Sequence, residues 1–117
     1  MTSAERLRTS TELSLLAEQH FVNGDDMAGA ELLWGALSQV IIAIAMQRGQ
    51  RYQEHQHRRH VMRQITGELD DPVIVEDYKD ANRLHVHFYL NNMTDVQVRD
   101  AAETTHTLIN RLLPLAA

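Results

Sequence analysis

The stretch DMAGAELLWGALSQVIIAIAMQ, residues 26–47, decides the fold that this sequence predicts. Large apolar side chains occupy nearly every side of a helix built on it, namely Leu32, Leu33, Trp34, Leu37, Val40, Ile41, Ile42, Ile44 and Met46. A helix that is apolar all round must be covered all round. We therefore expect this helix to be the central element of the fold or to lie in a subunit interface. We also expect Asp25 or Asp26 to cap its start and Gly49 to end it.

Helical periodicity continues on both sides of that segment, and no β-type alternation persists. The predicted flanking helices are one that stops at Asn23-Gly24, one near residues 54–69, one from Asp71-Pro72 to about Asn91, and one from a Thr94–Gln97 capping box to Pro114. Three of them have expected buried stripes: Leu13, Leu16, Ala17, His20 and Phe21; Val61, Ile65 and Leu69; and Val98, Ala102, Thr105, Ile109 and Leu112. The sequence thus predicts an all-α fold, an antiparallel bundle of four to five helices in a single domain spanning residues 1–117.

Composition excludes several classes of site. The 117 residues include no cysteine, which excludes disulfides, thiolate zinc sites and cysteine nucleophiles. The polar start MTSAERLRTS does not resemble a signal peptide, and the longest apolar run, VIIAIAM at 40–46, is too short to span a bilayer. We therefore expect a cytoplasmic protein that has no contact with a membrane.

The chain has a net charge of -5, yet its middle is strongly basic. The segment 48–63 carries five arginines and one acid, Glu54, which leaves a local charge of +4. A basic patch on an acidic body can hold a phosphate backbone, so we predict nucleic-acid contacts here; the alternative is a solvated helix face. The predicted contacts in this segment are Arg51, Arg58, Arg59 and Arg63.

The same segment contains three histidines and a carboxylate at helical spacing. Glu54, His57 and His60 lie at i, i+3 and i+6 and could touch one metal ion. The competing interpretation is that His57 covers the end of the Val61 stripe. We predict no metal and no cofactor, and keep the metal site as an alternative.

The stretch ANRLHVHFY, residues 81–89, holds the candidate catalytic residues. A helical wheel places Ile74, Tyr78, Ala81, Leu84 and Phe88 on a core-facing arc. His85 falls inside this arc and Tyr89 at its edge, whereas His87 falls outside, beside Arg83 and Asp80. We therefore expect His85 to be substantially buried and hydrogen-bonded. An arginine fork binds phosphate and a histidine can move protons at neutral pH, so Arg83 and His87 could act on RNA. The alternative is an Asp80–Arg83 surface pair with a spare histidine beside it.

Three stretches resemble the HEPN superfamily, small helical bundles of prokaryotic toxins, CRISPR effectors and defence proteins. They are AEQHFVNGDDMAGAELLWGAL at 17–37, AIAMQRGQRYQEH at 43–55 and ANRLHVHFY at 81–89, of which the third is the most specific. The resemblance implies a HEPN-like bundle that acts as a homodimer, with two motif helices meeting across a two-fold interface. It also implies RNA as a ligand, and a nucleotidyltransferase-type antitoxin or another protein as partner.

The resemblance also assigns site residues. HEPN ribonucleases carry an arginine, four to six residues and then a histidine, and one toxin branch adds a tyrosine two places later. Counting back from Tyr89 puts the histidine at His87 and Asn82 at the place of the arginine. Asparagine lacks the charged fork, and Arg83 stands one place later, about 100° around the helix. The resemblance thus implies a metal-independent endoribonuclease using Arg83, His87 and His85, in a degenerate motif that favours a non-catalytic role. Asn82 and Tyr89 would then contact nucleic acid.

A non-catalytic helical adaptor is the alternative function. Residues 17–37 also look like a single tetratricopeptide-style hairpin, and only one copy is present. Solenoids need about three or more such units, but an isolated hairpin can still bind a partner helix or peptide.

Overall fold

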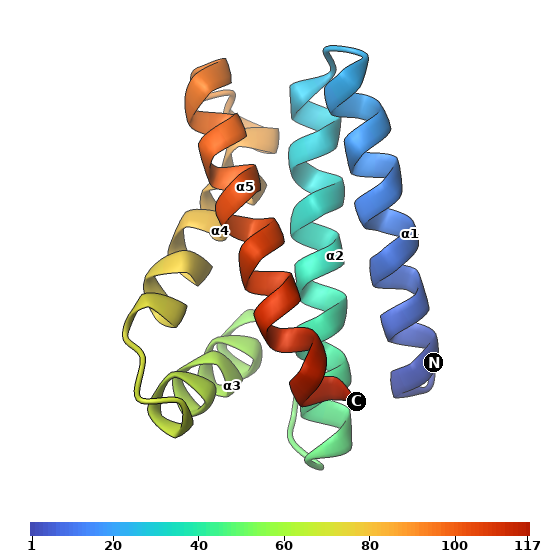
Figure 1. Ribbon diagram of the computed structural model, residues 1–117, viewed down its shortest axis with the longest axis vertical. Coiled ribbons are helices and arrows are strands. Elements are labelled where there is room, and N and C mark those ends of the chain that lie inside the picture. The colour runs from blue at the N-terminus through green and yellow to red at the C-terminus, as the bar shows by residue number, and fades with distance from the viewer.

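The computed structural model describes residues 1–117 as a bundle of five α-helices without a strand (Figure 1). In chain order the elements are α1 (Ser3–Val22), α2 (Asp26–Gln47), α3 (His55–Glu68), α4 (Val73–Leu90), α5 (Asp95–Leu112) and a short 3-10 helix, η1 (Leu113–Ala116). The all-α prediction is confirmed, and the helix predicted over residues 26–47 is α2.

Local signals set the helix ends. The Asp25 carboxylate accepts a hydrogen bond from the Ala28 N–H at 3.2 Å and caps α2. Thr94 and Gln97 form the predicted capping box at the start of α5. Gly24 and Gly49 have positive φ angles of 79° and 66°, a conformation that glycine adopts at little cost. Both glycines follow the helix ends for which they were predicted.

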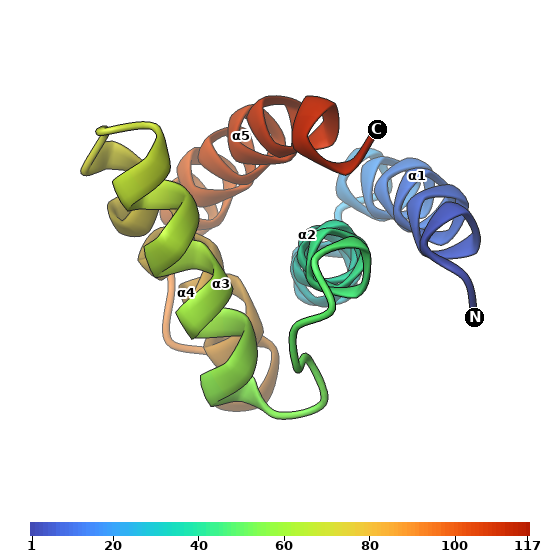
Figure 2. The same ribbon diagram turned by 90° about the horizontal axis from the view of Figure 1, so that it is seen from below.

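The central helix is α2. Seen end-on in Figure 2, it lies between α1 on one side and α3, α4 and α5 on the other. Its buried residues are Gly29, Ala30, Leu33, Trp34, Ala36, Leu37, Val40, Ile41, Ala43, Ile44 and Ala45. The predicted central position is therefore confirmed. By length and composition α2 could also cross a membrane, with a mean hydropathy of 1.6, but 56% of that apolar window is buried within the bundle.

The outermost helix, α1, packs chiefly along α2 (Figure 2). Ser10 and Ala17 are its buried residues, and the Ser10 hydroxyl donates a hydrogen bond to the Ala36 carbonyl at 2.8 Å. Leu16, predicted in the buried stripe, is 44% exposed. A helix with one main neighbour buries a narrower face than a core helix does, and Leu16 lies outside that face.

The stripe predicted for α5 is buried in full. On α3, Val61 and Ile65 are buried as predicted, whereas Leu69 is exposed because the helix ends at Glu68. A short turn joins α3 to α4, so the two helices face each other at one side of the bundle (Figure 1).

The buried side chains along most of α4 are spaced by three residues: Tyr78, Ala81, Leu84 and His87. At about 100° per residue, each step of three falls about 60° short of a full turn. The buried stripe therefore drifts around α4, following the i±3 ridge of the helix surface. The helix packs against α2, α3 and α5, and its last buried residue, His87, bonds to the loop before α5.

This drift makes three predictions for α4 wrong. His87, expected on a polar flank, is buried with 3% of its surface exposed. Phe88, expected in the core, is 36% exposed, and Tyr89, expected at the core edge, is 69% exposed. A single helical wheel assumes that one face of the helix is covered along its whole length, whereas the buried stripe of α4 shifts around the helix.

Candidate functional site

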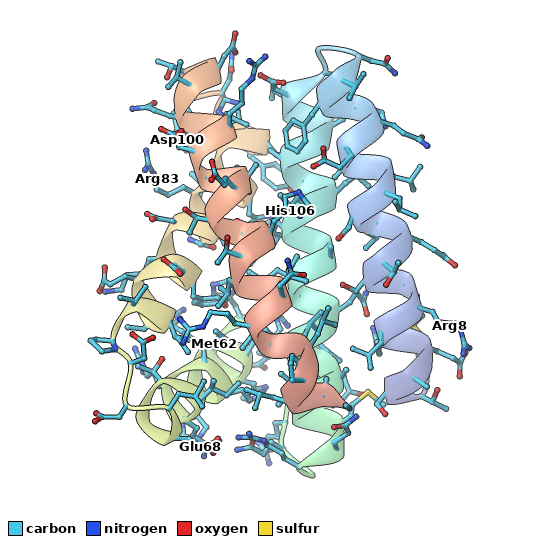
Figure 3. The ribbon with its side chains drawn as sticks, in the orientation of Figure 1. Arg8, Met62, Glu68, Arg83, Asp100 and His106 are labelled. Atoms are coloured by element: carbon cyan, nitrogen blue, oxygen red, sulfur yellow. The ribbon has the colours of Figure 1, made fainter.

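The three predicted catalytic residues point in different directions. The Nδ1 atom of His87 accepts a hydrogen bond from the Met93 N–H at 3.0 Å, so this buried ring fixes the loop that follows α4. Arg83 is exposed and lines a shallow pocket with Asp100 of α5; both residues are labelled in Figure 3. His85 faces α2 instead. The structure therefore does not bring Arg83, His85 and His87 together as one reaction centre.

His85 bonds to the central helix. Its Nδ1 lies 2.9 Å from a carboxylate oxygen of Glu31, and its ring stacks on Trp34 with centroids 5.6 Å apart. Tyr89 meets the same ring edge-on at 5.3 Å. The predicted hydrogen bond is confirmed, but His85 is half-buried rather than fully enclosed. The Glu31 carboxylate holds the imidazole in one orientation against α2.

A different set of residues converges between α3 and α4, on a cavity of about 410 Å³ that we call the basic cleft. It is lined by His55, Arg59 and Arg63 from α3 and by Val75, Tyr78, Lys79 and Asn82 from α4. The α3 residues are spaced by four and the α4 residues by three or four, so each helix presents one continuous face to the cavity. No carboxylate lines it, which suits an anionic ligand.

Trp34 connects the basic cleft to His85. Its ring centroid lies 6.0 Å from that of His55 and 5.7 Å from that of Tyr78. Burial lowers the pKa of His55, and the neighbouring Arg58 and Arg59 guanidinium groups lower it further. His55 is therefore neutral at pH 7 and can either donate or accept a hydrogen bond.

Tyr78 is the most deeply placed polar group of the cleft. The residue is only 4% exposed, and no protein group is hydrogen-bonded to its hydroxyl. Burial raises the pKa of Tyr78, so the hydroxyl keeps its proton at neutral pH. A buried hydroxyl that lacks a partner is uncommon in proteins and calls for an explanation.

Three of the six predicted nucleic-acid contacts line the basic cleft, and the other three lie outside it. Arg59, Arg63 and Asn82 line the basic cleft together. Arg58 instead donates hydrogen bonds to the Tyr52 and Gln53 carbonyls and holds the loop between α2 and α3. The other two lie outside the cleft, Arg51 beside His57 and His60 in a separate pocket and Tyr89 exposed near the end of α4.

Sequence reasoning missed three polar residues of the basic cleft, His55, Tyr78 and Lys79, and the apolar Val75. The spacing of His55, Arg59 and Arg63 by four was a usable signal, because residues four apart share one helix face. What the spacing could not show was that Lys79 and Asn82 face the same space from α4.

Nowhere in the chain do three or more histidine, aspartate or glutamate side chains come together as metal ligands. The alternative set of Glu54, His57 and His60 is therefore not gathered into a site. His57 Nδ1 accepts a hydrogen bond from the Glu54 N–H at 3.2 Å, which gives the ring a structural role at the start of α3.

On its α5 side, α4 borders a groove of opposite charge. This acidic groove, of about 310 Å³, is lined by Asp77, Asp100, Glu103, Thr104 and Thr107. Burial raises the pKa of Asp77, and the nearby Asp80 carboxylate raises it further. The two sides of α4 therefore carry opposite electrostatic fields.

Comparison with protein families matches residues 5–109 to the model described as the archaeal PaREP1/PaREP8 family. No curated protein and no solved structure matches the chain.

Proposed function

Because the chain belongs to the archaeal PaREP1/PaREP8 family and carries a carboxylate-free basic cleft, we propose that it is an RNA-binding helical domain. In this proposal Arg59, Arg63 and Lys79 contact backbone phosphates, and Asn82 adds an amide that can both donate and accept hydrogen bonds. The observation that carries the proposal is the convergence of these cations on one cavity, although the chain as a whole is acidic.

The HEPN-like character of the bundle belongs to the same proposal. It rests on the resemblance of the 81–89 segment, together with the all-α fold. RNA is the favoured nucleic acid because that resemblance points to RNA-directed proteins. A cytoplasmic location accords with the compact bundle, in which the one strongly apolar helix is the core element.

Binding is favoured over cleavage. A metal-independent ribonuclease needs its proton-transfer group within hydrogen-bond reach of the reacting atoms and a cation beside them. His87 is buried against the loop after α4, and Arg83 lies on the α5 side, away from the basic cleft. We therefore expect labelled RNA to remain intact after incubation with the protein in the presence of a chelator.

Protein partners have a separate candidate surface on α1. Leu15, Leu16 and Val22 are 62%, 44% and 82% exposed on this outer helix. Apolar side chains of this size mark contact surfaces when they lie close together. A homodimer, a nucleotidyltransferase-type antitoxin or another helical partner could cover this face, which is also where a non-catalytic adaptor would act. Light scattering at micromolar concentration tests the dimer, and a strict monomer would contradict it.

Fluorescence anisotropy with a labelled single-stranded RNA tests the RNA proposal. Replacing Arg59 and Arg63 by glutamine should weaken binding by about 10-fold and lower the salt slope by about 1.5, because two phosphate contacts to a single strand are lost. The matched control replaces Arg8 and Arg99, two exposed arginines outside the cleft, by glutamine. Figure 3 shows Arg8 projecting from α1, on the far side of the bundle from α4. An equal loss in both variants would overturn the assignment of binding to the basic cleft.

A further inference from the structure

The basic cleft has a feature that general attraction to phosphate does not explain. Tyr78 lines the cavity and is only 4% exposed, and its buried hydroxyl has no protein partner. Leaving a buried donor unpaired costs stability, whereas phenylalanine would fill nearly the same volume without that cost. A ligand group that enters the cavity and accepts a hydrogen bond would supply the acceptor that the hydroxyl lacks.

The charges around the hydroxyl indicate what that group is. Arg59, Arg63 and Lys79 supply three positive charges, and no acid lines the cavity. Lys79 also contacts Glu76 at 3.2 Å, but both side chains are well exposed, and such pairs are weak and easily exchanged. A phosphodiester carries one negative charge, whereas a phosphate monoester carries between about 1.5 and 2 at pH 7 and presents three terminal oxygens. The monoester is the better match to three cations and a hydroxyl donor.

The size of the cavity agrees with this choice. Its volume of about 410 Å³ falls within the usual range for small-molecule sites, about 300–1,000 Å³, and is far too small for a duplex. A terminal phosphate with its sugar can enter such a space, and Asn82 and His55 line it with further hydrogen-bonding groups. An internal phosphate of a nucleic acid would have to bring both flanking nucleotides along with it.

We propose that the basic cleft binds a phosphate monoester, either the phosphorylated end of an RNA or a free sugar phosphate, and that the Tyr78 hydroxyl donates a hydrogen bond to a phosphate oxygen. Arg59, Arg63 and Lys79 balance the charge of the group. This inference rests on the same cleft as the proposed RNA binding and names the part of the ligand that enters it.

Two pairs of probes test the inference. The first pair is one RNA sequence with either a 5′-phosphate or a 5′-hydroxyl, compared by anisotropy, with a 3′-phosphorylated version alongside. The second pair is ribose 5-phosphate and ribose, followed by the fluorescence of Trp34, which is the only tryptophan and lies 5.7 Å from the Tyr78 ring. We expect one phosphorylated end to bind at least about 5-fold more tightly than the hydroxyl end, and ribose 5-phosphate but not ribose to change the Trp34 signal.

The variant Tyr78→Phe removes the proposed donor alone. It should abolish most of the preference for the phosphorylated probe without lowering the melting temperature, because the hydroxyl has no protein partner to lose. Tyr89→Phe is the control, since Tyr89 is exposed and lies outside the cavity. A preference that persists in Tyr78→Phe would overturn the role of the hydroxyl.

The outcomes separate this inference from the proposed function. RNA binding that depends on Arg59 and Arg63 but ignores the terminal phosphate would overturn the inference and leave RNA binding standing. A Trp34 response to ribose 5-phosphate without any RNA binding would support the monoester site, identify the source as a free sugar phosphate, and overturn the RNA function. No response to any phosphorylated probe would overturn the inference outright.

Discussion

One helix, α4, separates two regions that differ in almost every electrostatic respect. Toward α3 it borders the basic cleft, which contains three permanent cations and no carboxylate. Toward α5 it borders the acidic groove, which contains three carboxylates and no cation. The net charge of -5 describes neither region. The comparison shows that ligand preference in a small bundle depends on the local field of one face, and that average composition can point the other way.

Both regions crowd like charges, and burial acts on them in the same sense. His55 has its pKa lowered, first by burial and then by Arg58 and Arg59. Asp77 has its pKa raised, first by burial and then by Asp80. In each case the shift favours the neutral form, although the Arg111 guanidinium opposes the shift at Asp77. Such crowding weakens the folded state, so we interpret the basic cleft as a region kept for binding rather than for stability.

Charge reversal in the basic cleft should have the largest effect of the variants considered, and the quantity that it changes is RNA affinity. Replacing Arg59 and Arg63 by glutamate turns two attractions into two repulsions, and RNA affinity should fall by about 100-fold. The variant with Arg8 and Arg99 changed to glutamate has the same net charge and should lose less than about 5-fold. Anisotropy titrations at one salt concentration measure both. Equal losses would mean that net charge governs binding and that the contrast between the two sides of α4 has no functional consequence.

The contrast also depends on the rotation of α4, which His87 helps to fix. His87→Ala removes a buried ring and leaves the Met93 N–H without its acceptor, so unfolding free energy should fall by about 2–3 kcal/mol. His85→Ala should cost less than about 1 kcal/mol, because His85 is half-buried and its Glu31 partner can turn to water. Urea unfolding of the two variants measures the difference. A smaller loss for His87→Ala than for His85→Ala would contradict the assignment of His87 as the structural histidine.

Several features of the fold could be predicted from the sequence. The position of α2 could be predicted because its apolar residues surround the helix, whatever its neighbours are. The ends at Gly24 and Gly49 and the Thr94 capping box could be predicted because those signals involve residues a few positions apart. Each of these features is a property of a single segment.

The predictions that failed concern contacts between two segments of the chain. His87 was placed wrongly because the buried stripe of α4 drifts with its neighbours, and a helical wheel contains no neighbours. The bond between His85 and Glu31 joins residues 54 positions apart, so its partner could not be named from spacing. Arg58 and Arg59 are adjacent arginines on α3. The Arg58 side chain nevertheless donates a hydrogen bond to the Tyr52 carbonyl, whereas Arg59 lines the cleft. The candidate site was thus found in part: its cations on α3 were predicted, but the opposing wall on α4 was not, apart from Asn82.

A change of pH should alter RNA binding on the basic side of α4. The His55 imidazole is neutral at pH 7, and a bound phosphate would favour its charged form, so binding would raise the pKa of His55. By linkage, RNA affinity should then increase as the pH falls, by about 3- to 10-fold between pH 7.5 and 5.5. The groups that oppose this protonation are Arg58, Arg59 and His85. His55→Gln should flatten the profile in anisotropy titrations, and an unchanged profile would assign the effect to another group.

The smallest expected effect lies on the acidic side, at Asp77. The pKa of its carboxyl is raised by burial and by Asp80, so the folded state binds this proton more tightly than the unfolded state. Stability from this group is therefore present below its unfolded pKa and lost as the pH rises through the folded value. Because the site is partly solvated, Asp77→Asn should stabilise the protein at pH 7 by only about 0.3 kcal/mol. The gain should vanish near pH 3, where the native carboxyl is already protonated.

Asp100→Asn, on the exposed rim of the same groove, should give no pH-dependent gain of this kind. If thermal melts show equal gains in the two variants at pH 7, the effect reflects the total charge of the groove, and burial at Asp77 contributes nothing specific.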